Sequence, residues 1–404
     1  MPSLLAWLDH TADDQRRMRE LVALFAQEDS RDELGIGAVR DAFSDLLFPG
    51  TSVLQTRTRY LLFVPWIFRE AEQRGMWGPS LRAWAEKRER WLIPALQRGG
   101  DQTGLIGRIA GPGVKILPST IYWTALQTYG IVRYRGSLEQ ALRVMRTEAG
   151  EADELAERHA SVWHPTLPPP AKGFFEFSSS TFHLSALEAG WLAERIADSV
   201  GESMLGQLVL RRLRPGPSSA PWDSQIRPEL PRDVRDALEH ARLFALAMHG
   251  AALVYNLLVA RRARLLNLAG AETWIEGYLA RLSEWSEECA QETAWSGWAR
   301  PEFWSLARHG NPNIREPTRR WVDSWLDLVV QGRAGDAASN PDIWALVGDR
   351  ERWIKRDKSR LTNDRLLAMW RGASGTARLD YRWSSVRPQV IDLLDGLEAS
   401  DSSS

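Results

Sequence analysis

Apolar residues recur at helical spacing along most of the chain. Leu81, Trp84, Trp91 and Leu92 fall on one face of an expected helix. The same periodicity predicts further helices over 184–196, 232–269 and 271–288. Strand patterns are few and are expected only at 3–8, 131–135 and 174–177. The sequence therefore predicts a mainly α, multi-helical protein with minor β structure.

Polar residues and prolines mark where helices begin. A capping box has Ser or Thr at the start of a helix and Glu or Gln three residues later, so that each side chain bonds a free backbone amide. The pairs with this spacing are Ser30 and Glu33, Ser52 and Gln55, and Ser137 and Gln140. The prolines that fit a first helical turn are Pro301, Pro317 and Pro341.

Three stretches rich in proline or glycine interrupt the helical pattern, at 164–173, 214–231 and 331–340. We expect these breaks to divide the chain into three parts. They are an N-terminal helical domain over 1–163, a central helical domain over 174–330 and a basic C-terminal helical segment over 341–399.

The composition is that of a globular protein. Of 404 residues, 44% are hydrophobic and 25% are charged, and the formal net charge is −1. The single cysteine, Cys289, excludes an internal disulfide and a zinc knuckle. The first residues lack the basic leader and the apolar core of a signal peptide. We therefore expect a cytoplasmic protein.

One uncharged run resembles a membrane span. It covers 243–260, which is about the shortest length that crosses a bilayer. His249 and Asn256 lie within it, and polar groups are costly in lipid. We expect a buried core helix and no membrane partner.

Two arginines, Arg57 and Arg59, precede a strongly apolar stretch. If this stretch is helical, it is apolar on all sides and should be buried. The arginines either form ion pairs with Asp41 and Asp45 of the preceding helix or bind an anion near the helix N-terminus. If the segment is instead a strand, Gln55, Arg57 and Arg59 line one face.

Residues from about 103 to 149 resemble a winged-helix segment of DNA-binding proteins. A helix expected to end at Gly130 is followed by a short basic strand that turns at Gly136. In such domains the helix enters the major groove and the wing touches the backbone. The side chains expected to contact DNA are Thr120, Tyr122, Trp123, Gln127, Arg133 and Arg135. The alternative is an ordinary helix and strand whose aromatic residues face inward.

A second basic segment covers 350–387, with eleven Lys and Arg residues against four acidic residues. Its candidate nucleic-acid contacts are Arg352, Arg356, Arg360, Arg382 and Trp383. The first three form one row if their segment is helical. Bases interleaved with aromatic residues are expected of a surface that tracks a phosphate backbone. The alternative is a solvated arginine face.

Two stretches resemble a known family. They are "RDELG.G..RDAFSDLLFPGTS..QTR.RY.LFVPWI" at 31–67 and "RLDYRW" at 378–383. The family they resemble is bacterial, uncharacterised and of about this length, and is described only as a domain of unknown function. The resemblance implies no reaction and no catalytic residues. It implies a place in mobile or anti-phage defence gene clusters, often near helicase or phospholipase-D-like nuclease genes.

No catalytic or metal signature stands out. None of the histidines has a second ligand at helical metal spacing, and the glycines of 104–113 lack the Gly-Lys-Ser/Thr of a P-loop. We therefore expect a non-catalytic nucleic-acid-binding component of a bacterial multi-protein defence system, bound to the backbone of DNA or RNA and using no cofactor.

Two alternative functions stay open. The first is a protein–protein adaptor for a helicase or nuclease, which the twenty tryptophans favour because Trp and Arg anchor interfaces. The second is a metal-dependent nuclease or hydrolase, whose scattered acidic ligands would leave little local pattern.

Overall fold

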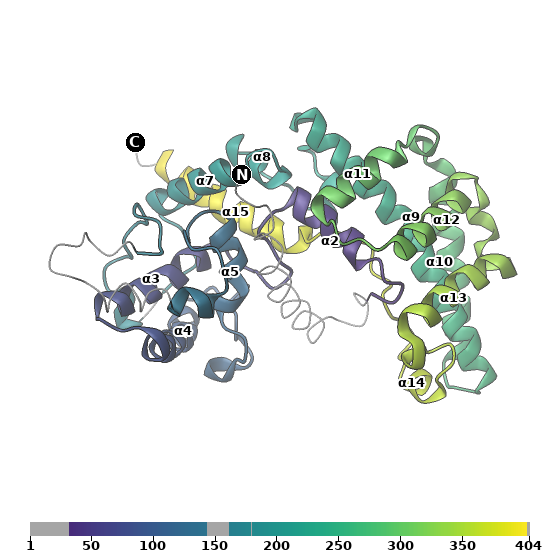
Figure 1. Cartoon of the computed structure of the whole chain (residues 1–404), viewed down its shortest axis with the longest axis horizontal. Coiled ribbons are helices and arrows are strands. Elements are labelled where there is room, and N and C mark those ends of the chain that lie inside the picture. Colours follow the sequence, from purple (N-terminus) through teal and green to yellow (C-terminus); the bar gives the residue numbers. More distant parts are fainter. Residues whose placement is uncertain (1–31, 144–160, 179, 402–404) are drawn as a thin grey trace, which may run out of the picture.

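The chain folds into two helical lobes with a layer of helices between them. The structure, a computed structural model, describes residues 32–143, 161–178 and 180–401. Figure 1 shows the first lobe on the left, in purple to blue, and the second lobe on the right, in teal to yellow-green. The fold is mainly α, as expected.

The first lobe contains α3 (Tyr60–Gln73), α4 (Gly78–Arg98) and α5 (Pro118–Thr128). Every residue of α3 from Tyr60 to Phe68 is buried. This confirms that the stretch that is apolar on all sides forms a buried helix. α4 packs beside α3 and buries a face that includes Leu81 and Leu92, so that its opposite face is open to solvent.

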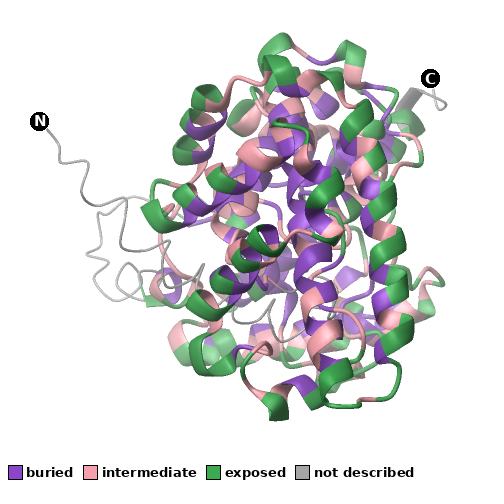
Figure 2. Cartoon of the chain, turned by 90° about the vertical axis from the view of Figure 1, so that its right-hand side faces the viewer, coloured by how far each residue is buried: buried purple, intermediate pink, exposed green. Residues whose placement is uncertain are grey.

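The second lobe surrounds one long helix. Its helices are α9 (Arg232–Leu265), α10 (Ala271–Gln291), α11 (Arg300–Gly310), α12 (Glu316–Val330), α13 (Pro341–Lys355) and α14 (Asp364–Ala368). α9 is long and apolar enough to cross a membrane, but 89% of its most apolar window is buried inside the protein. Figure 2 shows buried residues on the inner sides of the helices and exposed residues on the outside. α9 is therefore the buried core helix that was expected.

Two indoles fix the neighbours of α9. The indole N–H of Trp285 donates to the carbonyl of Leu246, and that of Trp325 donates to the carbonyl of Ala247, each over 2.8 Å. The Trp285 ring lies so close to Gly250 that a Cβ at this position would be 2.1 Å from it. A side chain here would displace the ring, which explains a glycine in the middle of a long helix.

The layer between the lobes contains α2 (Gly37–Leu47), α7 (Ala186–Val200), α8 (Met204–Leu210) and α15 (Trp383–Asp401). α2 lies early in the chain but packs on α11 and α9. α15 lies late in the chain but packs on α7 and α8. Helices from all three parts of the sequence therefore contribute to one hydrophobic core.

Short 3-10 helices complete the connections. They are η3 (Gly111–Gly113), η4 (Phe174–Glu176), η5 (Pro221–Asp223), η6 (Arg227–Glu229), η7 (Thr293–Gly297), η8 (Arg333–Ala338) and η9 (Arg356–Lys358). A further helix begins at residue 138, behind the capping box that Ser137 and Gln140 form as expected. The expected first-turn prolines are confirmed for Pro301, Pro317 and Pro341.

The expected β structure is wrong for the described residues, which contain no strand. Residues 131–135 form a single bridge, between Val132 and Trp163, and 174–177 turn into η4. The strand expected at 3–8 lies outside the described residues. No wing hairpin forms within 131–143, because the backbone there bonds to the distant residues 162–164 instead of to an adjacent strand.

The helix expected behind Ser52 begins only at Tyr60. The backbone amides of Thr56 and Arg57 donate to the Tyr122 hydroxyl over 2.8 and 3.0 Å. These bonds hold the preceding residues in an irregular path against α5. The strand alternative for this segment is also wrong, because no ladder of backbone bonds forms there.

A buried carboxyl joins α4 to the start of α5. Glu89 is 1% exposed and accepts hydrogen bonds from the backbone amide and the hydroxyl of Ser119, over 2.6 and 2.9 Å. Burial raises the pKa of Glu89 to about 7, although the bonds from Ser119 act in the opposite direction. The first turn of α5 therefore depends on a side chain from another helix.

We expect Glu89→Gln to change the pH dependence of stability. The folded protein holds the Glu89 proton up to about pH 7, whereas the ordinary pKa is 4.5. The free energy of unfolding should therefore fall by roughly 3 kcal/mol as pH rises through this window, and the neutral variant should lose that slope. Urea unfolding at about pH 5 and about pH 8 measures this. A variant that differs equally from the wild type at both pH values contradicts the assignment.

Candidate nucleic-acid interface

Arg57 joins the first lobe to the central layer. Its Nε lies 2.8 Å from Asp392 Oδ2 of α15, and its Nη1 lies 2.6 Å from Asp101 Oδ2. Its guanidinium also lies 4.6 Å from the centroid of the Phe182 ring. The charge of Arg57 is therefore neutralised inside the protein.

Arg59 is buried just before α3, with its Nη2 2.8 Å from Glu188 Oε1 of α7. Of the two interpretations of Arg57 and Arg59, the structure contains the ion pairs. The partners differ from the expected Asp41 and Asp45. Asp45 is bound by Arg382, and Asp41 pairs with an arginine of its own helix.

The stretch "RLDYRW" turns back onto α2. The Nη1 atom of Arg382 lies 2.6 Å from Asp45 Oδ1 and 2.7 Å from the carbonyl oxygen of Thr51. Trp383 is fully buried, and its indole N–H donates to the hydroxyl of Ser218 over 2.9 Å. Both residues were expected to contact nucleic acid, but both hold the fold together instead.

Arg360 belongs to a buried cluster around Glu33. Glu33 Oε1 lies 2.7 Å from Arg360 Nη1, and Oε2 lies 2.9 Å from Lys355 Nζ. The hydroxyl of Ser374 also donates to Glu33. Burial raises the pKa of Glu33, but the two cations and Ser374 outweigh it and hold the pKa at about 2. Glu33 is thus part of this cluster, and the capping box expected with Ser30 lies outside the described residues.

Arg352 and Arg356 are exposed but do not form the expected row with Arg360. α13 ends at Lys355, and Arg356 has a left-handed φ of 53° that begins η9. Arg352 pairs with Asp349 on the helix surface. The helix around them lies in the second lobe, whereas the other basic segment lies in the first lobe (Figure 1). The two basic segments therefore do not form one continuous surface.

The expected winged-helix contacts are divided between the interior and the surface. Trp123 is buried, and its indole and the Gln127 amide both donate to the carbonyl of Gly136. Arg133 and Arg135 follow on a segment where both are exposed. Gln127 is thus part of the fold, and the two arginines face solvent.

A cavity of about 1930 Å³ lies where the two family-resembling stretches meet, with residues of α2 and of "RLDYR" in its wall. Tyr381 and Arg382 both have left-handed backbones there, with φ of 50° and 72°. Opposite charges line the cavity as pairs, such as Arg382 with Asp45 and Arg378 with Glu288. Because these charges balance, the cavity does not suit a polyanion.

The outer side of α4 alternates cations with indoles. Trp84, Lys87, Arg88 and Trp91 have the spacing i, i+3, i+4 and i+7, which puts them on one face. The Arg88 guanidinium lies 4.8 Å from the centroid of Trp84 and 4.6 Å from that of Trp91. Lys87 Nζ lies 4.9 Å from the same Trp91 centroid. We call the following residues the α4 face: Trp84, Lys87, Arg88, Arg90, Trp91 and Arg98.

Positive charge exceeds negative charge on α4. The helix contains five Lys or Arg residues and two glutamates, one of which is the buried Glu89 with its raised pKa of about 7. Arg88 forms no ion pair with a described residue. Burial and the nearby charge of Arg74 lower the pKa of Arg88, although the charge of Glu70 acts in the opposite direction.

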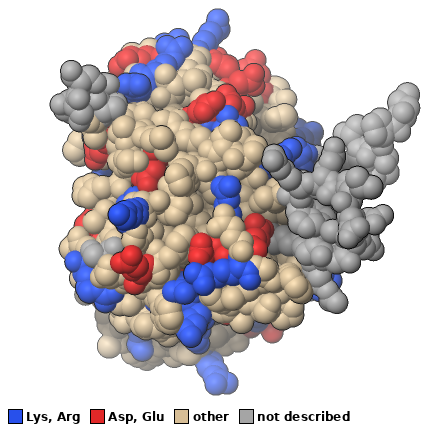
Figure 3. All heavy atoms as spheres, turned by 90° about the vertical axis from the view of Figure 1, so that its left-hand side faces the viewer, with Lys and Arg blue, Asp and Glu red and all other residues tan. Residues whose placement is uncertain are grey.

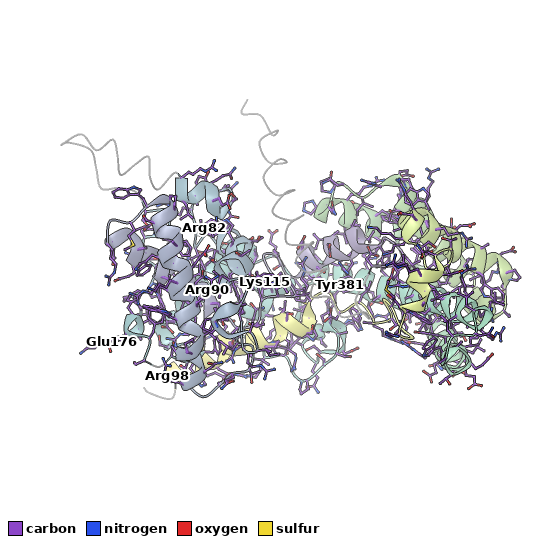
Figure 4. The ribbon with its side chains drawn as sticks, turned by 90° about the horizontal axis from the view of Figure 1, so that it is seen from below. Arg82, Arg90, Arg98, Lys115, Glu176 and Tyr381 are labelled. Carbon is purple, nitrogen blue, oxygen red and sulfur yellow. The ribbon has the colours of Figure 1, made fainter. Side chains whose placement is uncertain are left out.

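Basic side chains extend beyond α4. In Figure 4, Arg82, Arg90 and Arg98 follow the length of α4, and Lys115 lies beside it. Lys115 and Arg108 are exposed on the segment that packs on α4 through η3. Figure 3 shows Lys and Arg side chains on this end of the protein, many of them in its lower half, with Asp and Glu side chains between them. The first lobe therefore presents a positive surface.

The α4 face was not among the residues predicted to bind nucleic acid. Periodicity places Trp84 and Trp91 on one face with Leu81 and Leu92, but the two leucines are buried whereas Trp91 is exposed. The signal that could have revealed the face is the seven-residue spacing of Trp77, Trp84 and Trp91, with the charged run "EKRER" between the last two.

Comparison with known proteins adds a family but no activity. The chain matches the model of a family of unknown function (DUF6361) over residues 2–396. Both stretches that carry the resemblance lie inside this match. No curated protein and no solved structure matches the chain.

We expect Glu33→Gln to destabilise the protein by roughly 3 kcal/mol, because it leaves the partly buried Arg360 and Lys355 without their carboxylate. The loss should shrink as pH falls from about 4.5 towards 2, where wild-type Glu33 also becomes neutral. Chemical denaturation measures both effects. The matched control is Arg352→Gln, which breaks an exposed pair and should change stability by less than about 1 kcal/mol. Equal losses in the two variants would contradict a special role for Glu33.

Proposed function

The chain belongs to this family of unknown function, DUF6361, and we propose that it is a nucleic-acid-binding protein whose backbone-contacting surface is the α4 face. One observation carries the proposal. Arg88 is held between two indoles instead of beside a carboxylate. An aromatic ring fixes the position of a guanidinium without neutralising its charge, so the cation stays available to a phosphate.

The charge of the surrounding lobe supports the proposal. Residues 57–143 contain fourteen Lys and Arg residues against six Asp and Glu residues, although the whole chain is nearly neutral. Two of the six, Glu72 and Glu89, have a pKa raised to about 7 by burial. Such local excess of positive charge attracts a phosphate backbone and gives salt-dependent binding.

The arginines first predicted as contacts are poorer candidates. Arg57, Arg59, Arg360 and Arg382 each lie within 2.8 Å of a carboxylate oxygen. A phosphate would have to displace these buried or half-buried partners, which is strongly unfavourable. Arg133 and Arg135 are exposed in the same lobe as α4 and are retained as supplementary contacts.

We extend the proposal to a non-catalytic, cytoplasmic component of a bacterial anti-phage system that works beside helicase or nuclease proteins. Its support is the family resemblance, which implies such gene neighbours. Among the described residues, no three His, Cys, Asp or Glu side chains are grouped as a metal site needs.

A second candidate function is a protein adaptor. The observations that favour it are the exposure of Trp77 and Trp91 and the contact of Arg88 with Trp91, because Trp and Arg dominate interface hot spots. An adaptor should bind a partner protein with little dependence on salt. A phosphate-binding surface should lose affinity steeply as salt rises.

The proposal is tested with Lys87→Glu/Arg88→Glu, which reverses the two charges that contact the Trp91 ring. Affinity for a labelled oligonucleotide, measured by fluorescence anisotropy from about 50 to 200 mM salt, should fall. The slope of log affinity against log salt should become shallower by about 1.5, since two phosphate contacts are lost.

The matched control is Arg352→Glu/Arg356→Glu, which reverses two exposed charges in the other lobe. It should leave affinity and slope nearly unchanged. An equal loss in the control would assign binding to diffuse charge or to the C-terminal basic segment. Unchanged binding in the α4 variant would reject the α4 face.

A further inference from the structure

We infer that the nucleic acid bound at the α4 face is single-stranded, and that its unpaired bases stack on the indoles of Trp77 and Trp91. This inference rests on the proposed function and adds the class of nucleic acid to it. Four features of α4 support it: the spacing, the exposure and the cation contacts of its tryptophans, and its excess of positive charge.

The tryptophans form a row along α4. Trp77 is the N-cap residue of the helix, and Trp84 and Trp91 follow at intervals of seven residues. Seven residues are nearly two turns, so such side chains return to almost the same direction at steps of about 10 Å. The indoles of Trp84 and Trp91 therefore lie on one side of a rigid helix, and Trp77 precedes the first turn of that helix with an extended backbone.

Exposure sets two of these tryptophans apart. Among the described residues, Trp77, Trp91 and Trp353 are the exposed tryptophans, with 48%, 41% and 51% of their surface accessible. The others are buried or partly buried. Two of the three exposed indoles thus lie on one helix, and both lie within the positive lobe. Exposed aromatic surface beside cations indicates a contact site and not a packing need.

Two cations lie over the Trp91 ring, so a base that stacks on this ring must displace one of them, and the displaced cation stays close to the phosphate of the same nucleotide. Lys87 and Arg88 both lie within 5 Å of the Trp91 centroid, at 4.9 and 4.6 Å. Arg88 is fixed by its second indole, Trp84, whereas Lys87 is exposed on its flexible stem and can move to a phosphate. A nucleotide brings one flat base and one anionic phosphate to the same place, and this pair of groups matches an indole beside a cation.

The strand must be unpaired to use this arrangement. In a duplex the faces of the bases are covered by their neighbours, so that indoles on a convex helix cannot reach them. An acidic peptide would satisfy the cations but offers no series of flat rings. The row of exposed indoles therefore favours a single strand over a duplex and over an acidic protein segment.

The test compares a single-stranded oligothymidylate with a hairpin duplex of mixed sequence, at one salt concentration and then across a salt series. The double variant Trp77→Ala/Trp91→Ala should lose roughly tenfold in single-strand affinity for each indole. Its salt slope should stay close to that of the wild type, since no cation is removed. Its duplex affinity should change little.

Two controls separate stacking from folding. Trp77→Phe/Trp91→Phe keeps an aromatic face at both positions and should retain single-strand affinity within a few-fold. Trp353→Ala removes an equally exposed indole from α13 in the other lobe and should have no effect. A loss with Trp353→Ala as large as that of the α4 variant would overturn the assignment to these indoles.

The failures of the two proposals are distinguishable. Equal wild-type affinity for the single strand and the duplex, with a steep salt slope for both, overturns the single-strand inference and leaves the proposed function standing. Binding to neither probe overturns both. Salt-insensitive capture of a helicase or nuclease partner through Trp77 and Trp91, without binding to either oligonucleotide, would replace both with the adaptor function.

Discussion

Ion pairs between arginines and carboxylates that are distant in sequence hold this fold together. Arg57 reaches Asp392 across 335 positions, and Arg360 reaches Glu33 across 327. Both pairs are largely removed from water, where a guanidinium without its carboxylate would be strongly unfavourable. These pairs therefore determine which segments lie side by side, and the apolar helices pack around the paired segments. Four of the arginines that the sequence predicts to contact nucleic acid, Arg57, Arg59, Arg360 and Arg382, are used in this way.

The same constraint separates structural cations from available ones. A carboxylate both places an arginine and cancels its charge, whereas an indole places it and leaves the charge intact. Arg88, between Trp84 and Trp91, belongs to the second kind. α4 can present it because Leu81 and Leu92, on the adjoining part of the helix surface, are buried in the core and hold the helix in place. The positive surface of the first lobe thus depends on which groups its arginines contact, and composition and exposure alone do not explain it.

Much of the fold could be predicted from the sequence, and much of the site could not, for one physical reason. Helices are stabilised by hydrogen bonds between residues that are close in sequence. The apolar periodicity of α9 and the capping box at Ser137 can therefore be recognised in the sequence itself. The ion-pair partner of Arg59, by contrast, is Glu188 on another helix, and no local sequence pattern indicates this partner. Residues 131–135 have strand-like composition, but a strand needs a neighbour to pair with, and the fold supplies one bridge. The sequence groups Trp91 with the core leucines because helical spacing shows which residues share a face. The spacing does not show which part of that face is exposed to solvent.

The position of α2 has a consequence for how the protein is made. Its apolar side packs on α9 and α11, which emerge from the ribosome long after α2 itself. Throughout that interval the nascent chain carries an amphipathic segment whose docking site does not yet exist. The apolar side of α2 can reach its final partners only after α9, α11 and "RLDYRW" have been synthesised.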